Sequence, residues 1–308
     1  MDIEAYQSNN TQNMTLRSQV PDVTRVEPCW MGIDEAGRGP VLGPMVYGTC
    51  FCPISMKEKL EESGFADSKT LSEEQRENLF SKIGESADWT GWLVEILSPF
   101  YISTSMLRRF KYNLNELSHD CAIGMINKVI DAGVQLTEVY VDTVGDPGKY
   151  QAKLQQLFPQ VKCTVAKKAD ALYPIVSAAS ICAKVARDRA VKAWVFTEGA
   201  AIKVNENGFG SGYPADPNTK QFLVENLDQV FGFPHFVRFS WSTADKLLQD
   251  KAVPVHWDDD EEGNEGKAAK HAKNTPKLES FFNAKPAEVK AKTHRFFTER
   301  CLKSVEGF

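Results

Sequence analysis

Between residues 31 and 196, short apolar segments alternate with longer segments of helical period, and this order constrains the fold more than any other feature. The short segments predict β-strands at Met31–Asp34, Met45–Cys52, Gly91–Leu97, Glu138–Thr143 and Val161–Val165. The longer segments predict helices at 72–83, 114–131, 150–157 and 174–196. Because the strand–helix–strand unit at 138–165 suits a parallel pair, the sequence predicts an α/β fold with a central mixed β-sheet flanked by helices.

The chain divides into four parts by composition. Residues 1–27 are polar and patternless, which predicts a flexible N-terminal arm. Residues 28–250 hold the α/β domain and a helical end with helices predicted at 217–227 and 240–251. Residues 251–274 form a charged linker, and 275–308 form a helical C-terminal extension. The apolar residues of the extension are too few for a core of their own, so it needs another surface to pack on.

Composition excludes several classes of protein. No apolar run approaches the roughly 20 residues that span a bilayer, so no membrane association is expected. The seven cysteines are an odd number without a CxxC pair, which favours free thiols in a reducing compartment, the cytosol or the nucleus. The net charge of −5 excludes an overall basic signature, so any binding of nucleic acid must depend on local patches.

Acidic residues stand where predicted strands end. Asp34 and Glu35 end the first strand, Asp142 ends the fourth, and Asp170 follows the fifth. Such positions gather at one edge of an α/β sheet, and oxygen ligands without His or Cys suit Mg²⁺ or Mn²⁺. Two such ions can stabilise the attacking and leaving oxygens of a phosphodiester displacement. The alternative is that these acids cap helices or turns, and Glu35 can join the site only if its strand distorts, because neighbouring strand residues face opposite sides.

A glycine-rich loop follows these first two acids. Gly37 and Gly39 allow the backbone to approach a ligand closely, and Arg38 between them offers a charge for phosphate. The alternative is an ordinary hairpin turn. The spacing of the glycines does not fit a dinucleotide fingerprint, and the five histidines form no HExxH-like pair, so they are expected to be surface or satisfied side chains.

Three further segments carry residues suited to a nucleic acid. On the predicted helix 174–196, Ser177, Ser180, Lys184 and Arg187 form one polar stripe that can follow a phosphate backbone or simply face solvent. Lys69 lies in a hydroxyl-rich segment before a helix, where a simple N-cap is the alternative. Tyr213 lies in a glycine-rich loop and can stack on a sugar or base, although most loop tyrosines have no such role.

Six ordered motifs resemble those of the type 2 ribonuclease H family: DEAGRGP at 34–40, DSKT at 67–70, DT at 142–143, KADALYP at 168–174, SAASICAKVARD at 177–188 and GSGYP at 210–214. The resemblance covers residues 28–250. The chain beyond it is similar to the catalytic A subunit of the eukaryotic heterotrimer rather than to the single-chain prokaryotic enzyme.

The resemblance implies a ribonuclease H-like fold and a nuclear, metal-dependent endoribonuclease. Such an enzyme hydrolyses RNA in RNA–DNA hybrids and incises duplex DNA at single ribonucleotides, leaving 5′-phosphate and 3′-hydroxyl ends. Roles in ribonucleotide excision and RNA primer removal follow from the same resemblance. The alternatives are another ribonuclease H-like nuclease, such as an exonuclease or resolvase, and a non-catalytic hybrid-binding scaffold.

The family's residue roles carry over by motif. The resemblance implies a two-metal site for Mg²⁺ or Mn²⁺ at the catalytic acids Asp34, Glu35, Asp142 and Asp170. It implies substrate contacts at Gly37, Arg38, Gly39, Lys69, Lys184, Arg187 and Tyr213, with the glycine loop sensing the ribose 2′-OH.

The segment after the linker carries two partner predictions. By the same resemblance, residues 275–308 help to dock the B and C subunits. Leu278, Phe281 and Phe282 resemble the apolar half of a sliding-clamp-binding box, but Thr275 stands where a glutamine is expected.

Overall fold

The computed structural model describes residues 1–254 except 66–70, 111, 144 and 207. The chain divides into two compact units, Met1–Ala252 and Val253–Phe308, and nearly all described residues belong to the first. Lys69, most of the predicted linker and the whole 275–308 extension, with its docking and clamp-binding predictions, lie outside the described residues. No helix among the described residues is long and apolar enough to cross a membrane.

A six-stranded mixed sheet forms the centre of the first unit, in the order β1-β4-β3-β2-β5-β6. The strands are β1 (Met14–Arg17), β2 (Cys29–Ala36), β3 (Met45–Pro53), β4 (Gly91–Leu97), β5 (Leu136–Asp142) and β6 (Lys162–Ala166). The neighbouring pairs β1–β4, β4–β3 and β3–β2 are antiparallel, and the pairs β2–β5 and β5–β6 are parallel. The predicted α/β fold with a mixed sheet is confirmed.

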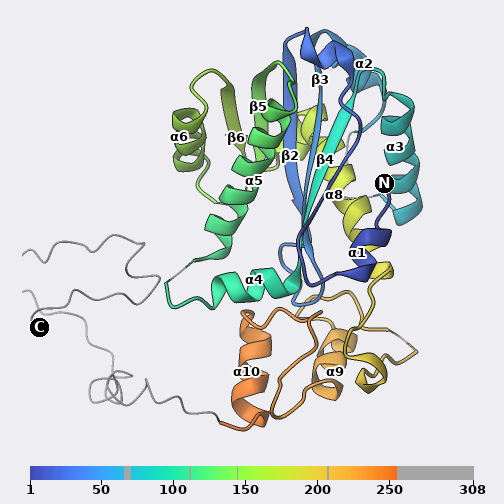
Figure 1. Cartoon of the computed structure of the whole chain (residues 1–308), viewed down its shortest axis with the longest axis vertical. Helices are drawn as coiled ribbons and strands as arrows, with labels where there is room; N and C mark the ends of the chain where they lie inside the picture. The colour runs from blue at the N-terminus through green and yellow to red at the C-terminus, as the bar shows by residue number, and fades with distance from the viewer. Residues whose placement is uncertain (66–70, 111, 144, 207, 255–308) are drawn as a thin grey trace, which may run out of the picture. The chain divides into compact units, whose positions relative to one another are not determined.

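Helices cover both faces of this sheet (Figure 1). One face packs on α4 (Pro99–Met106), α5 (Leu114–Asp131) and α6 (Pro147–Leu157). The other face packs on α2 (Lys57–Glu62), α3 (Glu73–Glu85) and the long α8 (Pro174–Lys192). Short helical turns η1 (Asp22–Arg25), η2 (Ile54–Met56), α7 (Ala169–Leu172) and η3 (Gly199–Ala201) connect these elements.

Local capping explains why α3, α5 and α8 begin where the sequence predicts, whereas α6 begins at Pro147, three residues before the predicted start at 150, and α4 was not predicted. Ser72 caps α3 in a capping box with Gln75. Asn113 caps α5 in a second box with Glu116, and α5 spans the predicted 114–131. Proline stands in the first turn of α6, α8 and α9 (Pro217–Glu225), where its missing N–H costs no hydrogen bond.

The prediction of a flexible arm at residues 1–27 is wrong for much of this segment. It contains α1 (Glu4–Ser8), β1 and η1. Tyr6 is buried in the core on the α8 side, and β1 pairs with β4 from Met14 to Arg17. The segment has no apolar run because β1 is an edge strand with alternating half-buried and exposed residues, and a short amphipathic strand of this kind leaves a weak sequence signal.

The helical end after α8 has a core of its own. This core joins α9, α10 (Ser242–Lys251), the segment between them and the loop after β2. It includes Phe222 of α9, Ala244 of α10, Phe236 and Val237 from the segment between them, and Leu42 from the loop. Figure 1 shows α9 and α10 beyond the end of the sheet to which β2 runs. The glycine-rich loop therefore lies between the sheet and the helical end.

Two glycines let α8 pack directly against the sheet. A Cβ at Gly32 of β2 would lie 2.3 Å from the carbonyl oxygen of Ile175, and one at Gly48 of β3 would lie 2.4 Å from that of Ala179. Because only glycine leaves room for this approach, the two strands fix the position of α8 and of the polar residues that it carries.

Candidate active site

The predicted acids meet at one edge of the sheet. β2 and β5 run parallel with Ile33 opposite Val141, so Asp34 and Asp142 are the next residues on adjacent strands. Asp170 lies in the first turn of α7, shortly after β6, which pairs with β5. Asp34 is 6% exposed; its Oδ1 accepts a hydrogen bond from the Glu35 backbone N–H at 2.7 Å, and the Ser180 hydroxyl of α8 donates to its carboxylate.

Asp34 and Glu35 approach the site from opposite faces of β2. Asp34 faces α8, whereas Glu35 lines a cavity with Asn115 of α5. The β2–β3 ladder stays in register through Ala36, so the strand distortion expected for Glu35 is absent from it. Both carboxyl groups nevertheless lie near Asp142, whose charge raises the pKa of each.

The backbone after β6 holds the Asp142 side chain in place. The Ala169 N–H donates to Asp142 Oδ1 at 2.7 Å. Lys168, just before it, has a φ of 57°, a left-handed conformation that is strained for a residue with a side chain. This turn aims the Ala169 amide at Asp142 and starts the helical turn that carries Asp170.

The acids are electrostatically coupled. Burial, followed by the charges of Glu35 and Asp142, raises the pKa of Asp34 well above its usual range. Burial also raises the pKa of Glu35 to about 7, with Asp142 and Asp170 adding to the rise and Arg38 opposing it. The influence of Asp142 on both pKa values, and of Asp170 on that of Glu35, shows that these carboxyl groups lie close enough to interact.

The donor set fits a hard divalent cation. All four side chains offer carboxylate oxygens, and a bound cation would offset their mutual repulsion. Among the described residues no group of three or more Asp, Glu, His or Cys side chains converges in a ready-made metal cluster. The residues that would hold such an ion are Asp34, Glu35, Asp142 and Asp170.

The raised pKa of Glu35 predicts how the stability of the metal-free protein depends on pH. Since the folded-state pKa is about 7 against an ordinary 4.5, the folded protein retains a proton that the unfolded chain loses. The unfolding free energy should therefore fall as pH rises from about 5 to 8, by up to about 3 kcal/mol. Glu35→Gln should reduce this fall in denaturant titrations with EDTA, and the part that remains belongs to Asp34, whose pKa is also raised. Exposed Glu61→Gln should leave the fall unchanged, and an unchanged slope in Glu35→Gln would contradict the assignment.

The glycine-rich loop brings several predicted substrate residues together. Gly37 has a φ of 77°, and a Cβ there would lie 2.1 Å from Arg187 Nε. A Cβ at Gly39 would lie 3.1 Å from the Tyr213 ring, which is 51% exposed. Arg187 is partly buried, and its buried Nε has no hydrogen-bond partner among the described residues. Gly37 thus lies against Arg187, and Gly39 against Tyr213, in the loop that follows Asp34 and Glu35.

The other predicted substrate residues are placed differently. Arg38 turns towards α5, where it donates hydrogen bonds to Ser118 Oγ and Asn115 Oδ1. Lys184 lies half-buried on α8. Ser177, expected on a polar stripe of this helix, is instead buried and donates to the Phe65 carbonyl.

A buried arginine that sequence reasoning missed holds the loop in shape. Arg238 is 0% exposed, and its guanidinium donates to the carbonyls of Gly43 at 2.8 Å, Gly37 at 2.6 Å and Arg38 at 3.2 Å. Trp241 Nε1 donates to the Gly39 carbonyl at 3.0 Å. Burial, followed by the charge of Arg187, lowers the pKa of Arg238 to about 9. The signal available in the sequence was one arginine within an apolar and aromatic run.

Replacing Arg238 with Lys should disorganise this loop. Lysine keeps the charge but cannot reach three carbonyls in different directions, which leaves buried acceptors unsatisfied. We expect a loss of about 2–3 kcal/mol in unfolding free energy by denaturant titration. The exposed Arg17→Lys is the matched control, and wild-type stability in Arg238→Lys would show that the guanidinium fork is dispensable.

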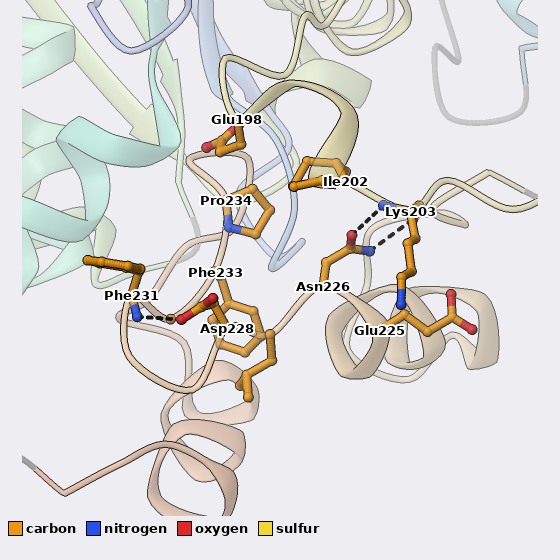
Figure 2. A pocket seen from close by; sticks show the side chains of 12 residues that line it. Glu198, Ile202, Lys203, Glu225, Asn226, Asp228, Phe231, Phe233 and Pro234 are labelled. Atoms are coloured by element: carbon orange, nitrogen blue, oxygen red, sulfur yellow. Dashed lines mark hydrogen bonds between the residues drawn. The ribbon is translucent and has the colours of Figure 1, made fainter.

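A separate concavity lies in the helical end and is not part of this site (Figure 2). It has a volume of about 460 Å³ and is lined by residues such as Lys203, Asn226 and Phe231, with none of the acids discussed above. Its walls are tied locally, since Asn226 bonds the Lys203 backbone and Asp228 accepts the Phe231 N–H.

A mixed sheet with carboxylates gathered at its strand ends defines a nuclease of the ribonuclease H-like fold. The ribonuclease H2 of Pyrococcus horikoshii OT3 has a similar structure, with a TM-score of 0.58 and 34% identity over 72% of this chain and 98% of that chain. A Bst ribonuclease HIII solved in complex with Mn²⁺ shares the fold at 17% identity and a TM-score of 0.54, covering 73% of this chain and 70% of that one.

Sequence comparison then gives the family. The family model described as Ribonuclease HII matches residues 31–244. Proteins named as the A subunit of ribonuclease H2 from Bos taurus and Homo sapiens are each 52% identical to this chain, over 305 and 306 residues that cover 99% of both chains. The chain belongs to the ribonuclease HII family. It is a hydrolase with ribonuclease H activity.

Proposed function

We propose that the chain is a divalent-metal-dependent endonuclease that cuts RNA in RNA–DNA hybrids and incises duplex DNA at single embedded ribonucleotides. The observation that supports it most is the anionic site at the ends of β2 and β5, where burial and neighbouring carboxylates raise the pKa of Asp34 and Glu35. Such a site is costly without a cation and becomes favourable with one.

The chemistry divides between the metal and the chain. Asp34, Glu35, Asp142 and Asp170 would hold Mg²⁺ or Mn²⁺, and the bound ion would supply an activated water and charge stabilisation for the leaving oxygen. Cleavage of this kind would leave 5′-phosphate and 3′-hydroxyl ends. Ser180 and the Ala169 amide orient the Asp34 and Asp142 carboxylates through the hydrogen bonds described above.

Recognition of the ribose falls to the loop held by Arg238. Its backbone groups at Gly37 and Gly39 can approach a 2′-hydroxyl closely and hydrogen-bond it without reading base sequence. The exposed Tyr213 ring beside Gly39 offers a flat apolar surface for the adjacent sugar. Arg187 adds positive charge behind Gly37 for the nucleic-acid backbone.

The decisive experiment uses a labelled DNA duplex with one ribonucleotide, an RNA–DNA hybrid and an all-DNA duplex. The full chain, with its partner subunits where cleavage requires them, is assayed with Mg²⁺, with Mn²⁺ and with EDTA. We expect cleavage of the first two duplexes with either metal, no cleavage with EDTA, and an intact all-DNA duplex. Cutting of all-DNA would favour another ribonuclease H-like nuclease, and binding without cutting would favour a scaffold.

The partner and compartment predictions rest on sequence alone. We propose that residues 275–308 dock the B and C subunits of a nuclear heterotrimer and that the Leu278 segment contacts a sliding clamp. The docking role is supported by relatives whose names describe one subunit of a larger enzyme. The clamp contact is supported by a ribonuclease HII of Archaeoglobus fulgidus that was solved in complex with PCNA. That protein is 31% identical to this chain, with a TM-score of 0.53 and coverage of 64% of this chain and 85% of that one. A chain ending at Asn274 that still assembles fully would refute the docking role.

A further inference from the structure

His119 stands next to the acids although its sequence context predicted no function. It lines the cavity that Glu35 and Asp142 also line, between the strand ends and the first turns of α5. Asn115, one helical turn earlier on the same face of α5, bonds the Arg38 guanidinium. His119 therefore belongs to the wall that faces the carboxylates.

The imidazole ring is held in a fixed plane. It stacks on the Tyr150 ring of α6 with centroids 3.7 Å apart and an interplanar angle of 14°. Tyr150 is itself buried at 5% exposure, so the stack has a rigid base. Because one face of the imidazole is covered, its nitrogens at the ring edge are the groups left to bind a ligand. Neither nitrogen has a hydrogen-bond partner among the described residues.

The surroundings of His119 suit an anionic ligand. Arg38, Asn115 and Ser118 supply hydrogen-bond donors or positive charge on the same wall. Burial, followed by the charge of Lys153, lowers the pKa of His119, while Asp120 and Glu116 oppose this and Arg38 adds to it. A neutral imidazole keeps one N–H donor at neutral pH. A phosphate near the acids would meet this donor rather than a competing carboxylate.

We propose that His119 contacts the substrate directly, by donating a ring N–H to a non-scissile phosphate oxygen of the strand that is cut. This inference rests on the proposed function, since it requires the phosphodiester to lie at the acids. It adds to the glycine loop a second contact surface, formed by α5 and α6, in the cavity that Glu35 lines.

The test separates hydrogen bonding from stacking. His119→Phe keeps a flat ring on Tyr150 but has no N–H, whereas His119→Gln keeps a donor and loses the ring. We expect His119→Phe to raise KM for an RNA–DNA hybrid about 3- to 10-fold with a smaller change in kcat, and His119→Gln to recover part of this loss. His235→Phe is the matched control, because His235 also contacts an aromatic ring, that of Phe100, and does not line the acid-containing cavity.

Substrates with a single methylphosphonate at successive positions locate the contact. One position should weaken binding by wild type and have no further effect on His119→Phe, because the same hydrogen bond is lost in both cases. Three outcomes would each overturn the proposal. They are a wild-type KM in His119→Phe, an equal rise in KM in His119→Phe and His119→Gln, and effects of the methylphosphonate and of His119→Phe that add at every position. Failure of the proposed function is distinguishable, since it would appear as cleavage that persists in Asp34→Asn.

Discussion

Replacing Asp34 with Asn should abolish cleavage while leaving the fold intact. The amide is nearly isosteric and can still accept the Glu35 N–H and Ser180 hydrogen bonds. It removes one charge from the metal-binding set, and we expect kcat for an RNA–DNA hybrid to fall about a thousand-fold or more. Because burial disfavours the Asp34 charge, the metal-free variant should be at least as stable as wild type in thermal unfolding.

Two measurements make this prediction specific. Asp131→Asn, at the far end of α5 and exposed, should cleave at the wild-type rate. Hybrid binding to Asp34→Asn should match that of wild type when both are measured in EDTA, where neither protein cuts. Near-normal cleavage by Asp34→Asn would remove the carboxylate site from the mechanism altogether.

Replacing Gly48 with Ala should cause a large loss of stability. The new Cβ would lie 2.4 Å from the Ala179 carbonyl oxygen and 2.6 Å from the Ala183 nitrogen, both backbone atoms of α8. Neither can rotate away, so α8 must move off the sheet. We expect a loss of about 3 kcal/mol and a fall in Tm of roughly 10 °C. Cleavage should fall as well, because α8 carries Ser180 to Asp34.

Gly84→Ala is the matched control for this substitution. Gly84 lies in α3, and a Cβ there meets no atom within 4 Å. Alanine is the better helix former, so this variant should gain up to about 1 kcal/mol. If Gly48→Ala unfolded at the same temperature as wild type, the close packing of α8 on β3 would not contribute to the stability of the fold.

The sequence predicts the parts of the fold that depend on local pattern. The strand Gly91–Leu97 and the helix Leu114–Asp131 have their predicted bounds, because a short apolar run and a capping box act within a few residues. Asp34 and Asp142 were found for a similar reason. An acid at the end of an apolar strand is conspicuous in the sequence, and parallel pairing of adjacent strands brings such ends together.

The missed features depend on contacts between distant parts of the chain. Arg238 bonds the carbonyls of Gly43 and Gly37, which precede it by 195 and 201 residues. No local period marks an arginine that satisfies backbone carbonyls. The direction of the Arg38 side chain was missed for the same reason. A positive charge in a glycine-rich loop suggests a phosphate contact, and the sequence gives no sign that Asn115 and Ser118 of α5 are its hydrogen-bond partners. The edge strand β1 was missed because its amphipathic pattern is weak and because its pairing with β4 joins residues far apart in the sequence.

The long sequence separation between Arg238 and the carbonyls that it bonds also has a consequence for biosynthesis. All six strands and α8 are complete by Lys192, so the sheet can assemble while the chain is still on the ribosome. The turn at 37–43 has to wait until residue 238 has left the exit tunnel, since its carbonyls have no other guanidinium to bond among the described residues. If this turn discriminates ribose from deoxyribose as proposed, a nascent chain would contain its carboxylates before it gained that selectivity, which would be among the last properties to form during translation.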